Sequence, residues 1–138
     1  MSWLLDTCVL SEVDKLRPEP RVIQWLDAQP ESSLFISALT IGEMQKGLKL
    51  LANREKQNRI ERAIVSLLIR FAGRILSFDI NVARQWGDIQ ATAKQNGFVL
   101  PAVDAFLAAT ALTHHLTFVT RNTDDLKYIR VPVLNPWL

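Results

Sequence analysis

The feature that most constrains the fold is a set of short, apolar segments separated by longer amphipathic ones. Such segments occur at residues 3–5, 34–36, 75–78 and 117–119. A strand with one face in water would alternate polar and apolar residues, and these segments do not. Strands buried on both faces are typical of a parallel sheet covered by helices on both sides. The pattern therefore predicts an α/β domain with three layers.

Between the short strands, apolar residues recur at helical spacing. The last segment, 131–137, contains two prolines and is predicted to form an edge strand, because proline is tolerated only at the edge of a sheet. In the longest helix, the expected buried face consists of Ile60, Ile64, Leu67, Leu68 and Phe71. The predicted helices cover 41–51, 57–71, 82–96 and 101–115, with a shorter one around 22–26.

Length and composition indicate one folded domain, which we expect to span residues 1–138. The chain has 138 residues, of which 49% are hydrophobic and 22% are charged. Its single cysteine, Cys8, excludes an internal disulfide, and no apolar run approaches the roughly 20 residues of a membrane span. The first residues lack a signal-peptide pattern, since Asp6 arrives at once. We therefore expect a cytoplasmic protein that does not interact with membranes.

Basic residues are concentrated in the middle of the chain. The segment 44–74 contains eight basic and two acidic residues, whereas the whole chain has a net charge of only +2. Such a stripe fits the phosphate backbone of a nucleic acid. The alternative is a solvated helical surface, in which Glu55 and Arg59 form an i,i+4 pair. The candidates for nucleic-acid binding are Lys46, Lys49, Arg59 and Arg62.

Four acidic residues fall where open α/β sheets bind ligands, beyond the carboxyl ends of the strands. Asp6 directly follows the first strand, and Asp125 lies just past the turn 120–122 after the fourth strand. Glu43 and Asp104 are expected in the first turns of helices that begin at the same edge.

Each of these acids also fits a structural role at a helix N-terminus. Thr40 and Glu43 have the spacing of a capping box. Asp6 could cap a short helix that starts at Thr7, and Asp104 would be favoured by the dipole in the first turn of its helix. Asn122 and Asp125 could together form a further cap. As a set, however, four acids from separate segments at one edge exceed what capping requires.

Carboxylates gathered at one edge need a cation or a proton. Two of them about 4 Å apart repel by roughly 4 kcal/mol at an effective dielectric constant near 20. A set of oxygen ligands without histidine or cysteine suits Mg²⁺ or Mn²⁺. These ions activate water and stabilise the leaving oxygen of a phosphodiester. Together with the basic stripe, the acids predict a metal-dependent nuclease.

Other chemistries fit the sequence less well. His114 and His115 are neighbours in a predicted helix and diverge by about 100°, so they cannot flank one substrate. The chain has no glycine-rich phosphate loop. A receiver-type phosphoacceptor domain would need an acidic pair after the first strand, whereas the pair Asp124 and Asp125 comes late.

Motifs along nearly the whole chain resemble those of PIN-domain ribonucleases. The similarity is greatest to the VapC-type toxins of toxin–antitoxin pairs, and among them to the FitB-like subgroup. The motifs are LDTCVLSE (5–12), SALTIGE (37–43), PAVDAFLAAT (101–110), VTRNTDD (119–125) and the closing VPVLNPW (131–137).

The resemblance implies a PIN-like three-layer α/β/α sandwich with a short parallel sheet of four or five strands. It also implies a toxin that is an Mg²⁺- or Mn²⁺-dependent endoribonuclease and cleaves single-stranded or loop RNA by metal-activated water. Asp6, Glu43, Asp104 and Asp125 match the family's catalytic, metal-binding acids, and Thr7, Thr120 and Asn122 match its supporting polar residues.

The same resemblance implies the partners. Family members are usually homodimers, and a small cognate antitoxin neutralises them and carries the part that binds operator DNA. We therefore expect this chain to bind RNA, a second copy of itself and an antitoxin, and to reach operator DNA only through the antitoxin.

Two positions leave questions open. Cys8 stands where the family often has asparagine, and the loss of that side-chain amide would loosen the hydrogen bonding around Asp6. Asp124 and Asp125 are adjacent, and the motif register favours Asp125 as the fourth acid. The cysteine leaves an alternative function: a catalytically impaired binding module that acts with its antitoxin as an operon corepressor.

Overall fold

The computed structural model describes residues 1–138 and contains five strands, six α-helices and two short 3-10 helices. Most strands have only two or three residues, which confirms the short apolar strands expected from the sequence. In chain order the elements are β1 (Trp3–Leu5), α1 (Thr7–Val13), α2 (Pro20–Asp27), η1 (Glu31–Ser33), β2 (Leu34–Ser37), α3 (Ala38–Leu50), α4 (Arg54–Arg70), β3 (Ile75–Leu76), α5 (Ile80–Gln95), α6 (Ala102–Thr113), β4 (Thr117–Val119), η2 (Asp124–Leu126) and β5 (Val133–Leu134).

The five strands form one parallel sheet in the order β3-β2-β1-β4-β5. The first strand is therefore central, and Leu4 pairs with Phe35 on one side and with Phe118 on the other. The proline-containing tail forms β5 at one edge, as predicted. Because all strands are parallel, the segments that follow β1, β2 and β4 leave the sheet at the same end.

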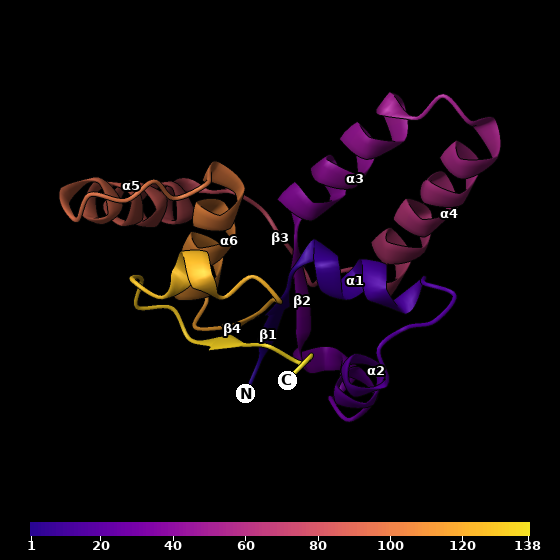
Figure 1. Ribbon diagram of the computed structural model, residues 1–138, viewed down its shortest axis with the longest axis horizontal. Helices are drawn as coiled ribbons and strands as arrows, with labels where there is room; N and C mark the ends of the chain where they lie inside the picture. Colours follow the sequence, from indigo (N-terminus) through magenta and orange to yellow (C-terminus); the bar gives the residue numbers. More distant parts are fainter.

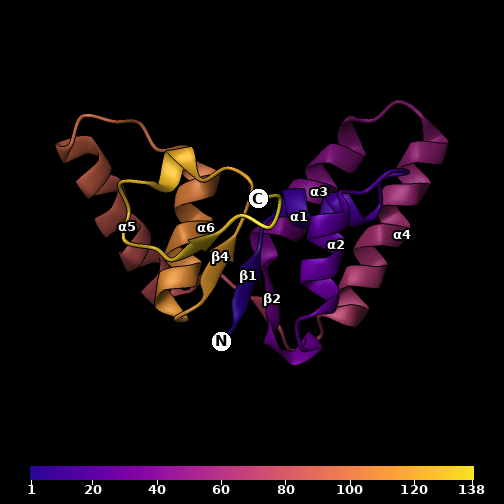
Figure 2. The ribbon, with the colours of Figure 1, turned by 60° about the horizontal axis from the view of Figure 1, so that its bottom comes forward.

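Helices cover both faces of the sheet. In Figures 1 and 2, α5 and α6 lie on one side of the strands, and α1 to α4 lie on the other. Successive residues of β1 enter different cores: Leu4 packs in the core with α5 and α6, and Leu5 in the core with α1 and α2. Both leucines are fully buried. This arrangement confirms the predicted three-layer α/β/α sandwich.

The start of α3 differs from the sequence-based prediction. Ser37 is the N-cap, since its hydroxyl accepts a hydrogen bond from the Leu39 amide over 3.0 Å. The helix therefore begins at Ala38, and the predicted capping box of Thr40 and Glu43 is wrong. Thr40 is buried in the first turn with an unpartnered hydroxyl, and Glu43 lies in the second turn.

The α3–α4 hairpin extends beyond the sheet, as Figure 1 shows. Helix α4 starts earlier than predicted because the Asn53 side chain caps it. Its buried face contains Ile64 and Phe71, but Leu68 is 45% exposed, so its assignment to that face was wrong. Gly73 ends the segment with a φ of 81°, a conformation that favours glycine. None of the helices has the length and apolar character needed to cross a lipid bilayer.

Truncation of a buried side chain in the central strand β1 should strongly reduce the stability of the protein. We expect Leu4→Ala to lower the free energy of unfolding by about 2–5 kcal/mol, because it leaves a cavity in a fully buried site. The matched control, Leu50→Ala, changes a leucine that is 76% exposed and should alter stability by less than about 0.5 kcal/mol. Urea denaturation followed by circular dichroism measures both, and equal effects would contradict the assignment of Leu4 to the core.

Candidate active site

Asp6 is held from several directions at the carboxyl end of β1. Its backbone amide donates to the Val119 carbonyl of β4 over 3.0 Å. One carboxylate oxygen accepts from the Thr7 amide at 2.7 Å, and the other accepts from the Thr120 hydroxyl at 2.7 Å. The expected cap of α1 by Asp6 is therefore confirmed. These donors fix the carboxylate between two neighbouring strands.

Cys8 contributes to the same arrangement. Its thiol donates to Asp6 over 3.4 Å and lies 3.9 Å from the Thr120 hydroxyl. Burial is the main cause that raises the pKa of the thiol, and the negative charge of Asp6 adds to it. The thiol therefore stays protonated at neutral pH, and a donor is retained where the family often has an amide.

Asn122 connects the acids of two other segments. Its side-chain amide donates to Asp125 over 3.0 Å and to Asp104 over 3.4 Å. Its backbone amide donates to the Thr120 hydroxyl over 3.1 Å, which links this group to Asp6. Asp104 lies in the first turn of α6, as predicted. The neighbouring Asp124 makes no side-chain hydrogen bond, so the geometry places Asp125 in the acidic group.

The protonation of Asp104 reflects its surroundings. Burial is the largest cause that raises its pKa, and the negative charges of Asp6 and Asp125 raise it further, to about 6. The carboxylates of Asp6, just after β1, and of Asp125 in η2 therefore act on Asp104 in α6. Such mutual repulsion is relieved by a proton or by a cation.

Glu43 and Asp6 both line one cavity of about 550 Å³, called the acidic cavity below. The Glu43 side chain is half-buried and makes no hydrogen bond. No three acidic, histidine or cysteine side chains lie close enough together to ligate one ion in this arrangement. The donors are nevertheless all oxygens, and the negative charges of Asp6 and Asp125 add to burial in raising the pKa of Asp104. Both properties fit a hard divalent cation.

The predicted basic residues divide into two groups. Arg59 lines the acidic cavity, and Arg62 lies beside it in an adjoining hollow. Lys46 and Lys49 are exposed on α3 and line neither space. The structure therefore brings only Arg59, and next to it Arg62, to the acids.

Two other cations of the basic stripe have a structural role. Arg70 binds the Glu31 carboxylate through two hydrogen bonds of 2.6 and 3.1 Å. Arg74 is 17% exposed and donates to the backbone carbonyls of Glu31 and Leu34. Both guanidinium groups also lie over the Phe71 ring. They fasten the end of α4 to η1 and to the start of β2, and are not free cations.

Sequence reasoning missed Lys15 and Asp14 at the end of α1. Both line the acidic cavity together with Asp6 and Glu43. The only signal in the sequence was the spacing of Lys15 from Glu12, because residues three apart meet on a helix. Both residues lie at the far end of the helix that follows β1, and not next to the strand end.

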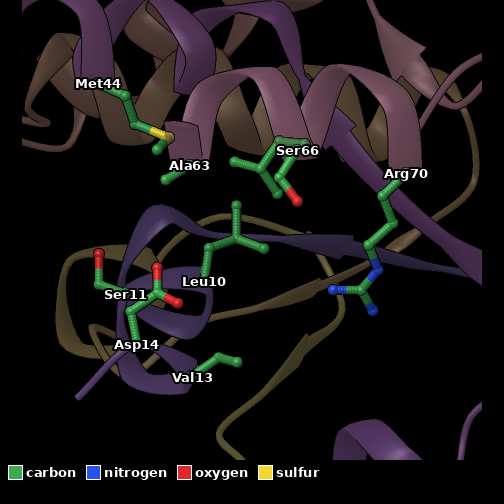
Figure 3. A pocket seen from close by; sticks show the side chains of 9 residues that line it. Leu10, Ser11, Val13, Asp14, Met44, Ala63, Ser66 and Arg70 are labelled. Carbon is green, nitrogen blue, oxygen red and sulfur yellow. The ribbon is translucent and has the colours of Figure 1, made fainter. Parts of the chain in front are cut away.

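A second hollow, of about 220 Å³, continues from the acidic cavity. Figure 3 shows Leu10 of α1 facing Ala63 and Ser66 of α4, with Arg70 at one end. The residues that line both spaces are Ser11, Asp14, Met44 and Ala63. The two spaces therefore form one continuous groove between α1 and the α3–α4 hairpin.

Known proteins resemble this chain in sequence. The family model described as PIN domain matches residues 3–132. Toxin FitB from Neisseria gonorrhoeae (strain ATCC 700825 / FA 1090) is 43% identical over 135 residues, which make up 97% of each chain. VapC ribonuclease Y4jK from Sinorhizobium fredii (strain NBRC 101917 / NGR234) is 36% identical over 138 residues, covering 97% of this chain and 96% of that protein.

Solved structures agree with the sequence comparison. The crystal structure of FitAcB from Neisseria gonorrhoeae has a TM-score of 0.91 at 41% identity and covers 98% of both chains. The structure of FitAB bound to an IR36 DNA fragment has a TM-score of 0.90 at 42% identity and covers 99% of this chain and 96% of that chain. The chain therefore belongs to the PIN-domain family and is related to FitB and VapC within it.

Proposed function

We propose that this chain is the toxin of a toxin–antitoxin pair and acts as an Mg²⁺- or Mn²⁺-dependent endoribonuclease. The observation that carries the proposal is the group of carboxylates Asp6, Asp104 and Asp125, in which burial, together with the negative charges of Asp6 and Asp125, raises the pKa of Asp104 to about 6. Relatives over nearly the whole length are named Toxin FitB and VapC ribonuclease Y4jK, which supports the same activity. We propose a single PIN domain over residues 1–138 that cleaves RNA in the cytoplasm.

Asp6, Asp104 and Asp125 would hold the cation, and Glu43, which lines the same cavity as Asp6, would complete the set. When bound, Mg²⁺ or Mn²⁺ lowers the pKa of water and neutralises charge on phosphate oxygens. This chemistry gives hydrolysis with 5′-phosphate and 3′-hydroxyl ends.

The surrounding residues keep the acids in place. Thr120 and Cys8 donate to one oxygen of Asp6, while the Thr7 amide donates to the other. Asn122 donates to the remaining two acids, Asp104 and Asp125. Hydrogen bonds of this kind orient the ligands of a metal ion. The hydrogen bonds therefore hold the three acids in position before RNA binds.

Exposed cations beside the cavity would bind the RNA backbone. Arg59 is the nearest of the predicted set because it lines the cavity itself, and Arg62 follows it along α4. Lys46 and Lys49 extend the positive surface along α3. Phosphate contacts of this type position a nucleic acid without reading its sequence.

The groove between α1 and the α3–α4 hairpin is our proposed site for the antitoxin. Its apolar residues include Leu10, Met44 and Leu67, and the acidic cavity forms one part of it. An antitoxin segment in this groove would cover the acids and exclude RNA. Operator DNA would then be reached through the antitoxin, as the relative described as FitAB bound to a DNA fragment suggests.

We further propose that the toxin forms a homodimer through the start of α5. Phe78 is 50% exposed and packs against Phe106, with ring centroids 4.5 Å apart. Ile80 is 77% exposed, and Val103 lies at the edge of the acidic cavity. An exposed apolar patch of this kind is typical of a protein interface.

The proposed activity predicts metal-dependent cleavage of RNA. Purified toxin should cut total cellular RNA into discrete fragments with Mg²⁺ and not with EDTA. Asp6→Asn, Asp104→Asn and Asp125→Asn should each reduce the rate by about 100-fold or more, because each removes a proposed ligand. Asp124→Asn is the matched control, since its carboxylate makes no hydrogen bond in the acidic group, and should retain cleavage.

The ends of the fragments provide a second test of the same prediction. Sequencing should find 5′-phosphate ends, and 2′,3′-cyclic phosphates would contradict the mechanism because they require attack by the ribose hydroxyl. If antitoxin-free, metal-loaded wild type cuts no RNA, the result would favour the alternative of a corepressor that only binds its antitoxin.

The raised pKa of Asp104 predicts a pH-dependent stability of the metal-free protein. Folding disfavours the charged form of the Asp104 carboxyl. The free energy of unfolding should therefore fall as the pH rises from about 4 to about 6. In EDTA at pH 7.5, Asp104→Asn should therefore stabilise the fold by about 1 kcal/mol, less than the full shift implies because solvent screens this partly exposed group. At pH 4 the variant and the wild type should be equally stable.

Thermal unfolding with and without metal completes this test. Mg²⁺ should raise the Tm of the wild type and raise that of Asp104→Asn much less. A variant that is less stable than the wild type at pH 7.5 in EDTA would show that Asp104 is not under repulsion from its neighbours.

The antitoxin groove predicts a separable effect on partner binding. Ala63→Glu places a longer, charged side chain inside the groove and should weaken antitoxin binding by about tenfold or more, because it fills space that the antitoxin would occupy and removes an apolar contact surface. The control Val65→Glu lies on the exposed side of the same helix and should change affinity less than twofold. Titration calorimetry measures both, and equal affinities would argue against this groove.

A further inference from the structure

A buried carboxylate outside the acidic group fixes a surface lysine. Glu12 of α1 is only 3% exposed. One of its carboxylate oxygens accepts from the Trp137 indole over 3.1 Å and from the Lys15 ammonium over 3.2 Å. Burial raises the pKa of Glu12, but the hydrogen bonds from Lys15 and Trp137 outweigh this effect, and the pKa lies below its ordinary value. Glu12 therefore stays charged and holds the ammonium in place.

Trp137 itself is fixed by contacts with distant segments. Its backbone amide donates to the Asn135 side chain over 2.9 Å, and its carbonyl accepts from Arg21 of α2 over 3.0 Å. The Arg121 guanidinium lies over its ring, 5.2 Å from the ring centre. Arg121 stands between Thr120 and Asn122, which both bind the acids. The C-terminal tryptophan thus connects α1 and α2 with the loop of the acidic site.

A cleft of about 430 Å³ lies beside this tryptophan, and three cations line it: Lys15, Arg17 and Arg121. Two carboxylates also line the cleft, but Glu12 is bound to Lys15, and Glu19 lies 3.8 Å from Arg21. Arg17 and Arg121 form no ion pair with any carboxylate. The cleft therefore presents uncompensated positive charge.

This cleft continues the acidic cavity. Lys15 lines both spaces, so it lies where the cavity that contains Asp6 meets the cleft. Arg59 lines the same cavity from α4. The acids are therefore flanked by cations from α1 and its following loop as well as from α4. A polyanion that enters the cavity needs such flanking cations, because the acids repel phosphate.

We propose that the cleft of Lys15, Arg17 and Arg121 binds the phosphate backbone of the RNA substrate on one side of the cleavage site. In this proposal Glu12 and Trp137 are positioning residues that act through Lys15. The inference rests on the proposed function, and it adds a binding site that lies outside the basic stripe. Arginine suits this role because its planar guanidinium binds phosphate through two hydrogen bonds.

Binding measured without cleavage tests the cleft. A fluorescent single-stranded RNA oligonucleotide of mixed sequence is titrated with the protein in EDTA at several salt concentrations. Arg17→Gln combined with Arg121→Gln should weaken binding about tenfold at low salt and reduce the salt slope by about 1.4, or about 0.7 for each lost phosphate contact. Arg84→Gln with Lys94→Gln, two exposed cations on α5, removes the same charge and should leave the slope nearly unchanged.

The positioning role has its own readout. Trp137→Phe removes the indole N–H and keeps an aromatic ring, so it should raise KM more than it lowers kcat. The same change in a Lys15→Gln background should have little further effect on KM, because the residue through which it acts is gone. A merely structural role would instead lower Tm and kcat together and would persist in that background, which would overturn this part of the inference.

The outcomes distinguish a failure of the cleft inference from a failure of the proposed function. If the wild type binds RNA and the double arginine variant binds equally well with the same salt slope, the cleft inference is overturned and the proposed function stands. If that variant loses affinity for the antitoxin but not for RNA, the cleft belongs to the protein partner and the inference is again overturned. A wild type that neither binds nor cleaves RNA overturns both.

Discussion

Asp6 is the residue at which the fold and the candidate site depend on each other. One carboxylate oxygen caps α1, and the other accepts the hydroxyl of Thr120 from the end of β4. Its backbone amide extends the pairing between the two strands. The same side chain therefore sets the direction in which the chain leaves the central strand and the position of the first acid. Loss of its charge would affect both roles, because the cap and the ligand share one group.

Electrostatic repulsion is the second constraint on the site. Asn122 links Asp104 and Asp125, and burial together with the charges of Asp6 and Asp125 raises the pKa of Asp104. A site of this kind is costly without a counter-charge, and cations surround it on several sides. Arg59 comes from α4, and Lys15 is fixed by the buried Glu12. Acidic residues surrounded by basic side chains suit a substrate whose phosphates bind the basic side chains and of which one phosphate reacts at the acids.

Much of the fold was predictable from the sequence, because the short strands are apolar on both faces and the helices are amphipathic. Asp6, Asp104 and Asp125 were identifiable because they stand next to strand ends or in a helical first turn. The start of α3 was misplaced because Ser37 and Thr40 are both plausible caps, and local spacing does not tell which hydroxyl reaches a free amide. Arg70 and Arg74 were counted with the exposed cations because their partner, Glu31, is far away in the sequence.

The sequence by itself determined the layers of the fold, the family and the four candidate acids, since each of these follows from local pattern or motif. Only the tertiary structure decided which charges meet. It placed Asp125, and not Asp124, beside Asn122, and it brought Trp137 to Glu12 across 125 positions of the chain. Hydrogen bonds and Coulomb interactions act over a few ångströms of space, whereas sequence patterns report only on neighbours along the chain. For that reason the cleft beside Trp137 could be identified only from the tertiary structure.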